Sequence, residues 1–265
     1  MGWTPVPAGT LATPVSVANG GTGSATAAAA RTALDVAQAP TWTDYPNMVQ
    51  VTLAEQADSI TTPPASFSWD NDAELDSSSI DGSGVWSMDH DATSTGVTTG
   101  PRCKISTTFR PGRRRAVAAF VSTADGDANH EGVGVLMEES SGSNYHLAGI
   151  QFTSGQERAF AYANGGYNGP VNGDIIAGGS MAAGVWIMLW EETISSTTAM
   201  GAAYVLGGAA GTPPDADAWT PLGDQAYASG TSAPWDTMQI GAWCKSGNVS
   251  NTMTGQIHAL WIGEV

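Results

Sequence analysis

Short stretches of alternating apolar and polar residues, separated by turn residues, make up most of this sequence after Ser66. No window after Leu34 keeps a helical period for more than two turns, whereas short alternating runs are typical of strands. Such strands need two stacked layers to bury their apolar faces. We therefore expect an all-β jelly roll or related β-sandwich with eleven strands: Ser66–Trp69, Gly84–Met88, Cys103–Phe109, Ala116–Ser122, Gly132–Met137, Tyr145–Phe152, Arg158–Ala163, Trp186–Glu191, Met200–Leu206, Met238–Cys244 and Gln256–Ile262.

The first quarter of the chain differs in composition and in its pattern of apolar residues. Three prolines keep residues 1–18 extended, which suits an attachment arm. Residues 19–36 combine a glycine-rich turn with an alanine-rich helix, and residues 37–65 form a proline-containing connector with one expected strand at Val49–Leu53. The sandwich domain is expected to occupy residues 66–265.

The alanine-rich helix is too short to be stable alone. Ser24 offers a cap, but an isolated helix of fewer than ~12–15 residues is marginal in water, and alanine buries little apolar area. Packing against copies of itself would stabilise it. We therefore expect an oligomerisation element that uses Ala27, Ala28, Ala30, Arg31 and Leu34.

The segment VANGGTGSATAAAARTALDV, residues 17–36, resembles a segment that recurs in bacteriophage tail-fibre and related virion proteins. The resemblance implies a homotrimeric fibre in the virion, with another virion protein bound at the N-terminal arm and a distal domain that binds the host surface. A head fibre or capsid-decorating protein of the same architecture is the structural alternative.

Composition narrows the function classes. Only 13% of the residues are charged, 33 are glycine and ten are tryptophan, as in β-rich extracellular or virion proteins. A net charge of −16 opposes binding to nucleic-acid phosphates. The longest apolar run, Val185–Trp190, is too short for membrane insertion, and the first residues show no signal peptide. We expect a virion component that is assembled in the host cytoplasm and released by lysis.

Residues 66–265 resemble concanavalin-like lectin and glucanase sandwiches in the order of their features. These features are an early Phe67–Trp69 strand, a basic hairpin, a central Tyr145–Phe152 strand and a closing Gly255–Gly263 strand. The resemblance implies that the sandwich binds glycan. Aromatic residues in loops are common platforms for sugars, and each tryptophan has a core or subunit interface as its alternative. The candidates are Tyr162, Asn164, Tyr167 and Asn168 in one group, and Trp219, Tyr227 and Trp235 in another, with Trp243 expected to be exposed on the face opposite Ile240.

No catalytic motif is found. Concanavalin-like glucanases carry a Glu-x-Asp-x-(x)-Glu pattern, but here Glu191 and Glu192 are adjacent, and no glutamate follows Glu74-Leu75-Asp76. We expect a protein that is not an enzyme. A tailspike depolymerase, with carboxylates drawn from separate strands or chains, is the enzymatic alternative.

The charged clusters and the cysteines leave a few alternatives open. The acidic segment 70–91 has alternate carboxylates that suit calcium, but a solvated loop is the preferred interpretation, and we expect no metal and no cofactor. Arg113–Arg115 is either a patch for an anionic polysaccharide or for the acidic segment of another subunit, or a solvated strand start. Cys103 and Cys244 share the apolar side of their strands, which favours buried free thiols over a disulfide.

Overall fold

The structure is a computed structural model. It describes residues 48–53, 67–70, 75–91, 102–108, 115–123, 131–139, 145–164, 173–194, 197–215, 218–222, 226–229, 237–245 and 252–264. The chain divides into two compact units, residues 1–38 and 39–265, and all the described residues belong to the second. The expected arm, the glycine-rich turn and the oligomerisation residues Ala27, Ala28, Ala30, Arg31 and Leu34 lie outside the described residues.

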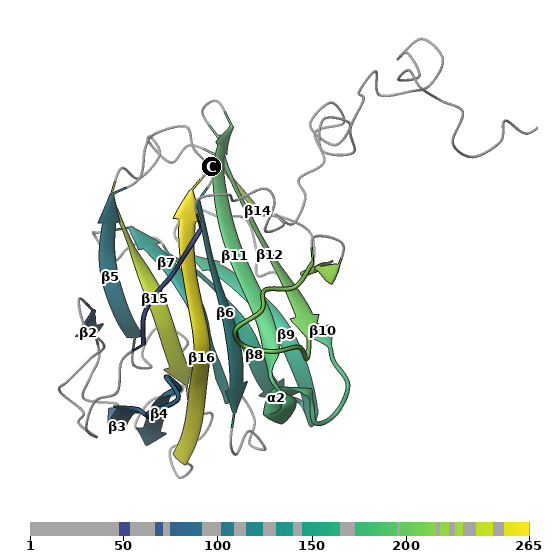
Figure 1. Cartoon of the computed structure of the whole chain (residues 1–265). Helices are drawn as coiled ribbons and strands as arrows, with labels where there is room; N and C mark the ends of the chain where they lie inside the picture. Colours follow the sequence, from purple (N-terminus) through teal and green to yellow (C-terminus); the bar gives the residue numbers. More distant parts are fainter. Residues whose placement is uncertain are drawn as a thin grey trace, which may run out of the picture. The chain divides into compact units, whose positions relative to one another are not determined.

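Two antiparallel sheets build the described part of the chain (Figure 1). The nine-stranded sheet has the order β13-β12-β11-β6-β16-β4-β3, with β1 also paired to β16 and β14 to β12. Its strands are β1 (Val49–Gln50), β3 (Leu75–Ile80), β4 (Trp86–Asp91), β6 (Arg115–Thr123), β11 (Val185–Ile194), β12 (Thr197–Leu206), β13 (Thr220–Pro221), β14 (Ala226–Ser229) and β16 (Thr252–Glu264). The seven-stranded sheet has the order β10-β9-β8-β7-β15-β5-β2. Its strands are β2 (Ser68–Asp70), β5 (Arg102–Thr108), β7 (Gly132–Glu139), β8 (Tyr145–Thr153), β9 (Gln156–Asn164), β10 (Asp174–Ile175) and β15 (Thr237–Lys245).

All eleven predicted strands are present, with end points that differ by a few residues, so the predicted all-β sandwich is confirmed. The strand expected at Val49–Leu53 is shorter than predicted, because only Val49–Gln50 pairs as β1. Sequence reasoning missed β10, β13 and β14, which have two to four residues each, and it also missed β3.

The described part of the acidic segment 70–91 is not the solvated loop that its charges indicate, because residues 75–80 and 86–91 form strands, while residues 71–74 lie outside the described residues. β3 and β4 form an antiparallel hairpin in which Ile80 pairs with Trp86, and both residues face the core. The Asp89 carboxylate accepts hydrogen bonds from Ser77 within this hairpin and from Thr254 on the neighbouring strand β16. The sequence of β3 does not predict a strand, because its two apolar residues, Leu75 and Ile80, stand at its ends and the four residues between them are aspartate and serine.

The core lies between the two sheets and follows the period-2 alternation of the strands. On β6, the side chains of Val117, Ala119 and Val121 face it, and Val133 and Val135 of β7 face it from the other sheet. Each of these side chains is completely buried. Cys103 and Cys244 are buried in the same core and are not joined by a disulfide, as predicted.

The outer face of the nine-stranded sheet is also buried around its middle strands. Trp186, Met188 and Trp190 alternate with core residues along β11, yet all three are completely buried. Phe120, on the outer face of the neighbouring β6, contacts Trp186 with a ring-centroid distance of 5.6 Å. This explains the continuous apolar run Val185–Trp190, because a strand that is covered on both faces needs no polar side.

A four-residue helix, α2 (Ser180–Ala183), is the only helix among the described residues. Glu157 of β9 holds its start: one carboxylate oxygen accepts the backbone N–H of Gly179 at 2.6 Å, and the other accepts that of Met181 at 2.7 Å. No helix within the described ranges has the length and apolar character needed to span a membrane.

Candidate functional site

The residues predicted to bind carbohydrate fall in different parts of the fold. Tyr162 and Trp243 lie on one face of the seven-stranded sheet, the face turned away from the core. Trp219 precedes β13 and is 8% exposed. Asn164 ends β9, but its side chain lies outside the described residues, as do Tyr167, Asn168, Tyr227 and Trp235. Of the eight proposed residues, the structure therefore brings together Tyr162 and Trp243.

Trp243 is buried, which contradicts the expectation that it is exposed. It is 1% exposed and belongs to a second apolar cluster on the outer face of the seven-stranded sheet, made of Leu136, Tyr145, Leu147, Phe160 and Trp243, with Tyr162 packed against it. A Cβ added at Gly132 or Gly149 would come within 3.0 Å or 2.9 Å of the indole ring. Glycines at these two positions therefore leave the space that the ring fills.

The cations beside this cluster have a carboxylate partner. Lys104 Nζ lies 3.1 Å from Glu138 Oε2, and Arg102 Nη1 lies 3.4 Å from the same oxygen. The Arg102 guanidinium carbon also lies 6.0 Å from the centre of the Tyr145 ring. Glu138 is 1% exposed and offsets one of the two positive charges, and the side chains of Arg102 and Lys104 are only 11% and 9% exposed, so this charge cluster presents little basic surface.

Arg115 is not a surface arginine. It begins β6 with 1% of its surface exposed, opposite Glu191 of β11 in the strand register. Burial raises the pKa of Glu191 to about 7, and the Arg115 charge acts against that rise. The interpretations of Arg113–Arg115 as an anionic-glycan patch or as a solvated strand start are thus wrong for Arg115, while Arg113 and Arg114 lie outside the described residues. The described residues contain no group of three His, Cys, Asp or Glu placed to hold a metal ion.

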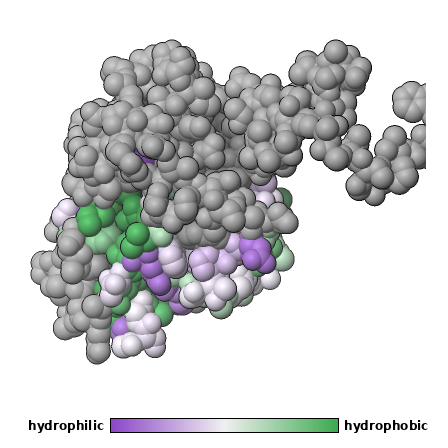
Figure 2. Space-filling model, turned by 45° about the horizontal axis from the view of Figure 1, so that its top comes forward, coloured by the Kyte–Doolittle hydropathy of each residue, from purple (hydrophilic) through white to green (hydrophobic). Residues whose placement is uncertain are grey.

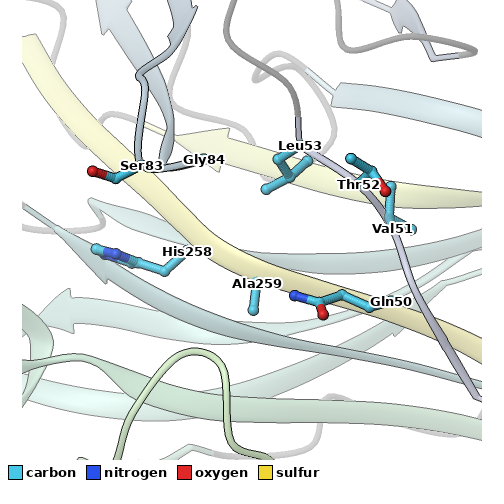
Figure 3. Close-up of a pocket in the computed structure, with 8 residues that line it drawn as sticks. All are labelled: Gln50, Val51, Thr52, Leu53, Ser83, Gly84, His258 and Ala259. Carbon is cyan, nitrogen blue, oxygen red and sulfur yellow. The ribbon is translucent and has the colours of Figure 1, made fainter.

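An open pocket of about 360 Å³ lies on the nine-stranded sheet, at the edge of β16. Along this edge β16 pairs with β4 up to Ile257 and with β1 from Trp261 onward. The partner of β16 therefore changes between Ile257 and Trp261. Figure 3 shows the pocket at that break. Its lining is the segment Gln50–Leu53, the turn residues Ser83 and Gly84, and His258 and Ala259 of β16.

A β-bulge in β16 sets the position of His258. The register with β6 moves from Ile257 opposite Val121 to Ala259 opposite Phe120, so His258 is the additional residue. A bulge places one unpaired residue in the strand and bends it locally. The consequence is that both Ile257 and Leu260 face the core, although they are three positions apart.

Hydrogen bonds from the sheet hold the His258 ring. Ser122 Oγ lies 2.8 Å from His258 Nε2 and donates to Gln256 Oε1 at 3.1 Å. A hydroxyl has one proton, so we assign the Nε2–H tautomer to His258, in which the imidazole donates to Ser122 and Nδ1 carries the lone pair. The Phe120 ring packs edge-on at 5.6 Å. Ser122 is 4% exposed and its proton is committed to Gln256, so it is a support for the ring rather than a nucleophile.

The pocket carries no positive charge at neutral pH. Burial lowers the pKa of His258, and the Asp81 carboxylate acts in the opposite direction without overcoming it. Asp81 is anchored on the β3–β4 turn, where its Oδ1 accepts the backbone N–H of Ser83 at 2.8 Å and of Val85 at 2.9 Å. None of the described residues that line the pocket is lysine or arginine. The arrangement can hydrogen-bond hydroxyl and amide groups beside the apolar side chains of Val51, Leu53 and Ala259.

Sequence reasoning missed this pocket because its residues come from three distant segments. One local signal was available: the apolar residues Ile257 and Leu260 break the alternation of the closing strand, and such a break predicts a bulge. Gln50 and Ser83 carry no comparable signal, because exposed polar residues at a strand end or a turn are ordinary.

Comparison with known proteins shows the fold and no family. No family model matches the chain, and no curated protein matches its sequence. A bifunctional GH43-CE protein of Bacteroides eggerthii has a TM-score of 0.54 at 12% identity, over 77% of this chain and 25% of that one. The GH43 protein BlXynB of Bacillus licheniformis has a TM-score of 0.51 at 11% identity, over 77% and 38%. The chain thus spans a quarter to about two fifths of these two proteins.

Lectins share the architecture at a lower level of similarity. Lectin UEA-II, solved in complex with galactose, has a TM-score of 0.44 at 9% identity, over 83% of this chain and 99% of that one. The two antiparallel sheets confirm the all-β sandwich that the sequence predicts, and parts of the two GH43 proteins share this fold.

Proposed function

We propose that this chain is a bacteriophage virion fibre protein whose β-sandwich binds a host-surface glycan in the pocket at the β16 bulge. A shared fold does not carry a function by itself, so the proposal depends on the site. The observation that carries it is the open pocket of about 360 Å³, in which Gln50, Thr52, Ser83 and His258 surround a small apolar surface. That volume is at the lower end of the ~300–1,000 Å³ usual for ligand pockets, which suits one or two sugar rings.

The mixture of groups in the pocket matches the chemistry of a sugar. A pyranose presents hydroxyls at its rim and C–H groups on its faces, so it needs donors, acceptors and apolar contact together. Gln50, Thr52 and Ser83 are exposed and offer amide and hydroxyl groups, while Val51 and Leu53 are half-buried beside them. On the face shown in Figure 2, polar and apolar surface likewise lie side by side.

The fibre part of the proposal rests on the resemblance of residues 17–36 to virion fibre segments. In this proposal residues 1–18 attach to another virion protein, the alanine-rich helix forms a homotrimer, and the sandwich faces the host. Light scattering on the full-length chain measures the oligomeric state directly. A mass near three chains is the expected result, and a monomer at micromolar concentration would contradict the trimer.

Glycan binding is tested on an array of bacterial-surface oligosaccharides with the full-length chain. The double variant Gln50→Ala, Ser83→Ala removes two exposed polar groups from the pocket, so we expect at least a tenfold loss of binding with an unchanged melting temperature. The matched control is Thr212→Ala, Thr220→Ala, which removes two exposed hydroxyls away from the pocket and is expected to bind normally. Equal binding by the pocket variant and the control would place the glycan site elsewhere.

A further inference from the structure

We propose that the pocket at the β16 bulge selects uncharged saccharides and rejects those that carry carboxylate or phosphate groups. This inference rests on the proposed glycan binding and adds the chemical class of the ligand. It is carried by the neutral groups that line the pocket, which come from the β3–β4 turn, from β16 and from the segment Gln50–Leu53, and by the negative charge of Asp81 on that turn.

The groups that contact a ligand in the pocket are neutral. Gln50, Thr52 and Ser83 present amide and hydroxyl groups, and the half-buried ring of His258 has its Nε2–H directed to Ser122. Recognition of carboxylate or phosphate usually relies on arginine, lysine or a helix N-terminus. None of these features is present among the described residues that line the pocket.

Among the described residues, a negative charge acts on the pocket, that of Asp81. Asp81 lies in the turn that supplies Ser83 and Gly84 to the pocket, and its negative charge acts to raise the pKa of His258. Hydrogen bonds from Ser83 and Val85 fix its carboxylate, so it cannot swing away when an anion enters. The whole chain adds a charge of −16, which lowers the local concentration of anionic ligands at low salt.

The four cations whose side chains the structure describes are engaged elsewhere. Arg102 and Lys104 are paired with Glu138 on the outer face of the seven-stranded sheet, and Arg115 lies beside Glu191 at the end of the core. Arg158 donates to the carbonyl of Gly173 at 3.1 Å. None of these four cations belongs to the lining of the pocket, so none is in place to offset the negative field there.

The test uses matched ligands on one array: neutral hexose oligosaccharides, and the same oligosaccharides oxidised at C6 to uronic acids. With the full-length chain at low salt, we expect neutral forms to bind at least tenfold more tightly than their oxidised partners. The difference should shrink at high salt, because screening weakens the repulsion. Tighter binding of the oxidised forms would overturn the inference while leaving glycan binding established. Binding of neither form would remove the proposed function itself.

Two charge variants separate electrostatics from shape. Asp81→Asn keeps the hydrogen-bond acceptor of the turn but removes its charge, so it should narrow the preference for neutral sugar by several-fold. Asp215→Asn, at an exposed position away from the pocket, is the matched control and should leave the preference unchanged. Gln50→Lys adds a cation to the pocket and should raise binding of the oxidised forms, whereas Thr220→Lys should not. If Asp81→Asn and Gln50→Lys both behave like their controls, charge does not set the selectivity.

Discussion

Replacing Trp243 by alanine distinguishes a structural tryptophan from a sugar platform. As a solvent-exposed platform, Trp243 would contribute to glycan binding and little to stability. The structure instead places it in the apolar cluster on the outer face of the seven-stranded sheet, 1% exposed, with its ring 5.5 Å from the Phe160 ring in an edge-on arrangement. We therefore expect Trp243→Ala to destabilise the protein and to leave glycan recognition by the folded protein intact.

The size of the effect follows from the area that is lost. A buried tryptophan removes ~150–250 Å² from water, and at ~25 cal/mol per Å² this contributes roughly 4–6 kcal/mol. Large-to-small substitutions of tryptophan in protein cores cost ~3–5 kcal/mol. For a domain of this length, a loss of about 4 kcal/mol lowers the melting temperature by roughly 8–16 °C.

Urea denaturation followed by far-UV circular dichroism measures this loss. Trp243→Phe keeps an aromatic ring in the cavity and should lower the free energy of unfolding by about 1–2 kcal/mol. This variant measures the contribution of the side chain even if the alanine variant fails to fold. Val49→Ala, at a side chain that is 68% exposed, is the control and should change stability by less than about 0.5 kcal/mol. If Trp243→Ala matched the control in stability but lost glycan binding, the assignment of Trp243 to a buried cluster would be refuted.

Three further substitutions test separate features of the fold. Glu157→Ala removes the carboxylate that accepts two backbone N–H groups at the start of α2. Hydrogen exchange of those two amides should therefore accelerate, and the free energy of unfolding should fall by about 1–3 kcal/mol. Unchanged exchange would contradict the role of Glu157 in holding the start of α2. Burial raises the pKa of Glu191 from 4.5 to about 7, so the folded state keeps a proton that the unfolded chain releases. Stability should therefore fall by up to about 3 kcal/mol as pH rises from 4.5 to 7, and Glu191→Gln should flatten this slope in thermal melts; an equally steep slope in the variant would assign it to other groups. Gly201→Ala would place a Cβ 2.4 Å from the Trp190 ring and should cost about 1–3 kcal/mol, while Gly178→Ala, with open space around it, should be neutral; equal melting temperatures would show that the indole ring moves aside.

The strands were predictable because their patterns survive in the primary sequence. Alternation located the long strands, and the unbroken apolar run Val185–Trp190 marked a strand that is covered on both faces. A strand that lacks an alternating apolar pattern could not be predicted. Leu75–Ile80 reads as polar and acidic, yet it pairs with β4, since backbone hydrogen bonds are available to any side chain except proline.

The site was harder to predict for a different reason. Alternation assigned Trp243 correctly to the face opposite Ile240, but it could not show that this face is buried too. Period-2 patterns say which side chains share a face and nothing about what lies over it. The same limit applies to Arg115, which shares the core face of β6 with Val117 and is buried beside Glu191 despite its charge.

The bulge in β16 links the architecture to the site. If β16 kept a regular alternation, Ile257 and Leu260 would face opposite sides of the sheet, and one of them would leave the core. The additional residue restores both to the core and places His258 at the point where the edge of β16 passes from β4 to β1. A strand edge between two partners has backbone groups and side chains that no neighbouring strand covers, and a pocket forms there in this protein. On the outer faces of the two sheets, the side chains around β11 on one sheet and around Trp243 on the other are buried. The break in pairing at β16 therefore leaves an open pocket in which polar and apolar side chains lie together.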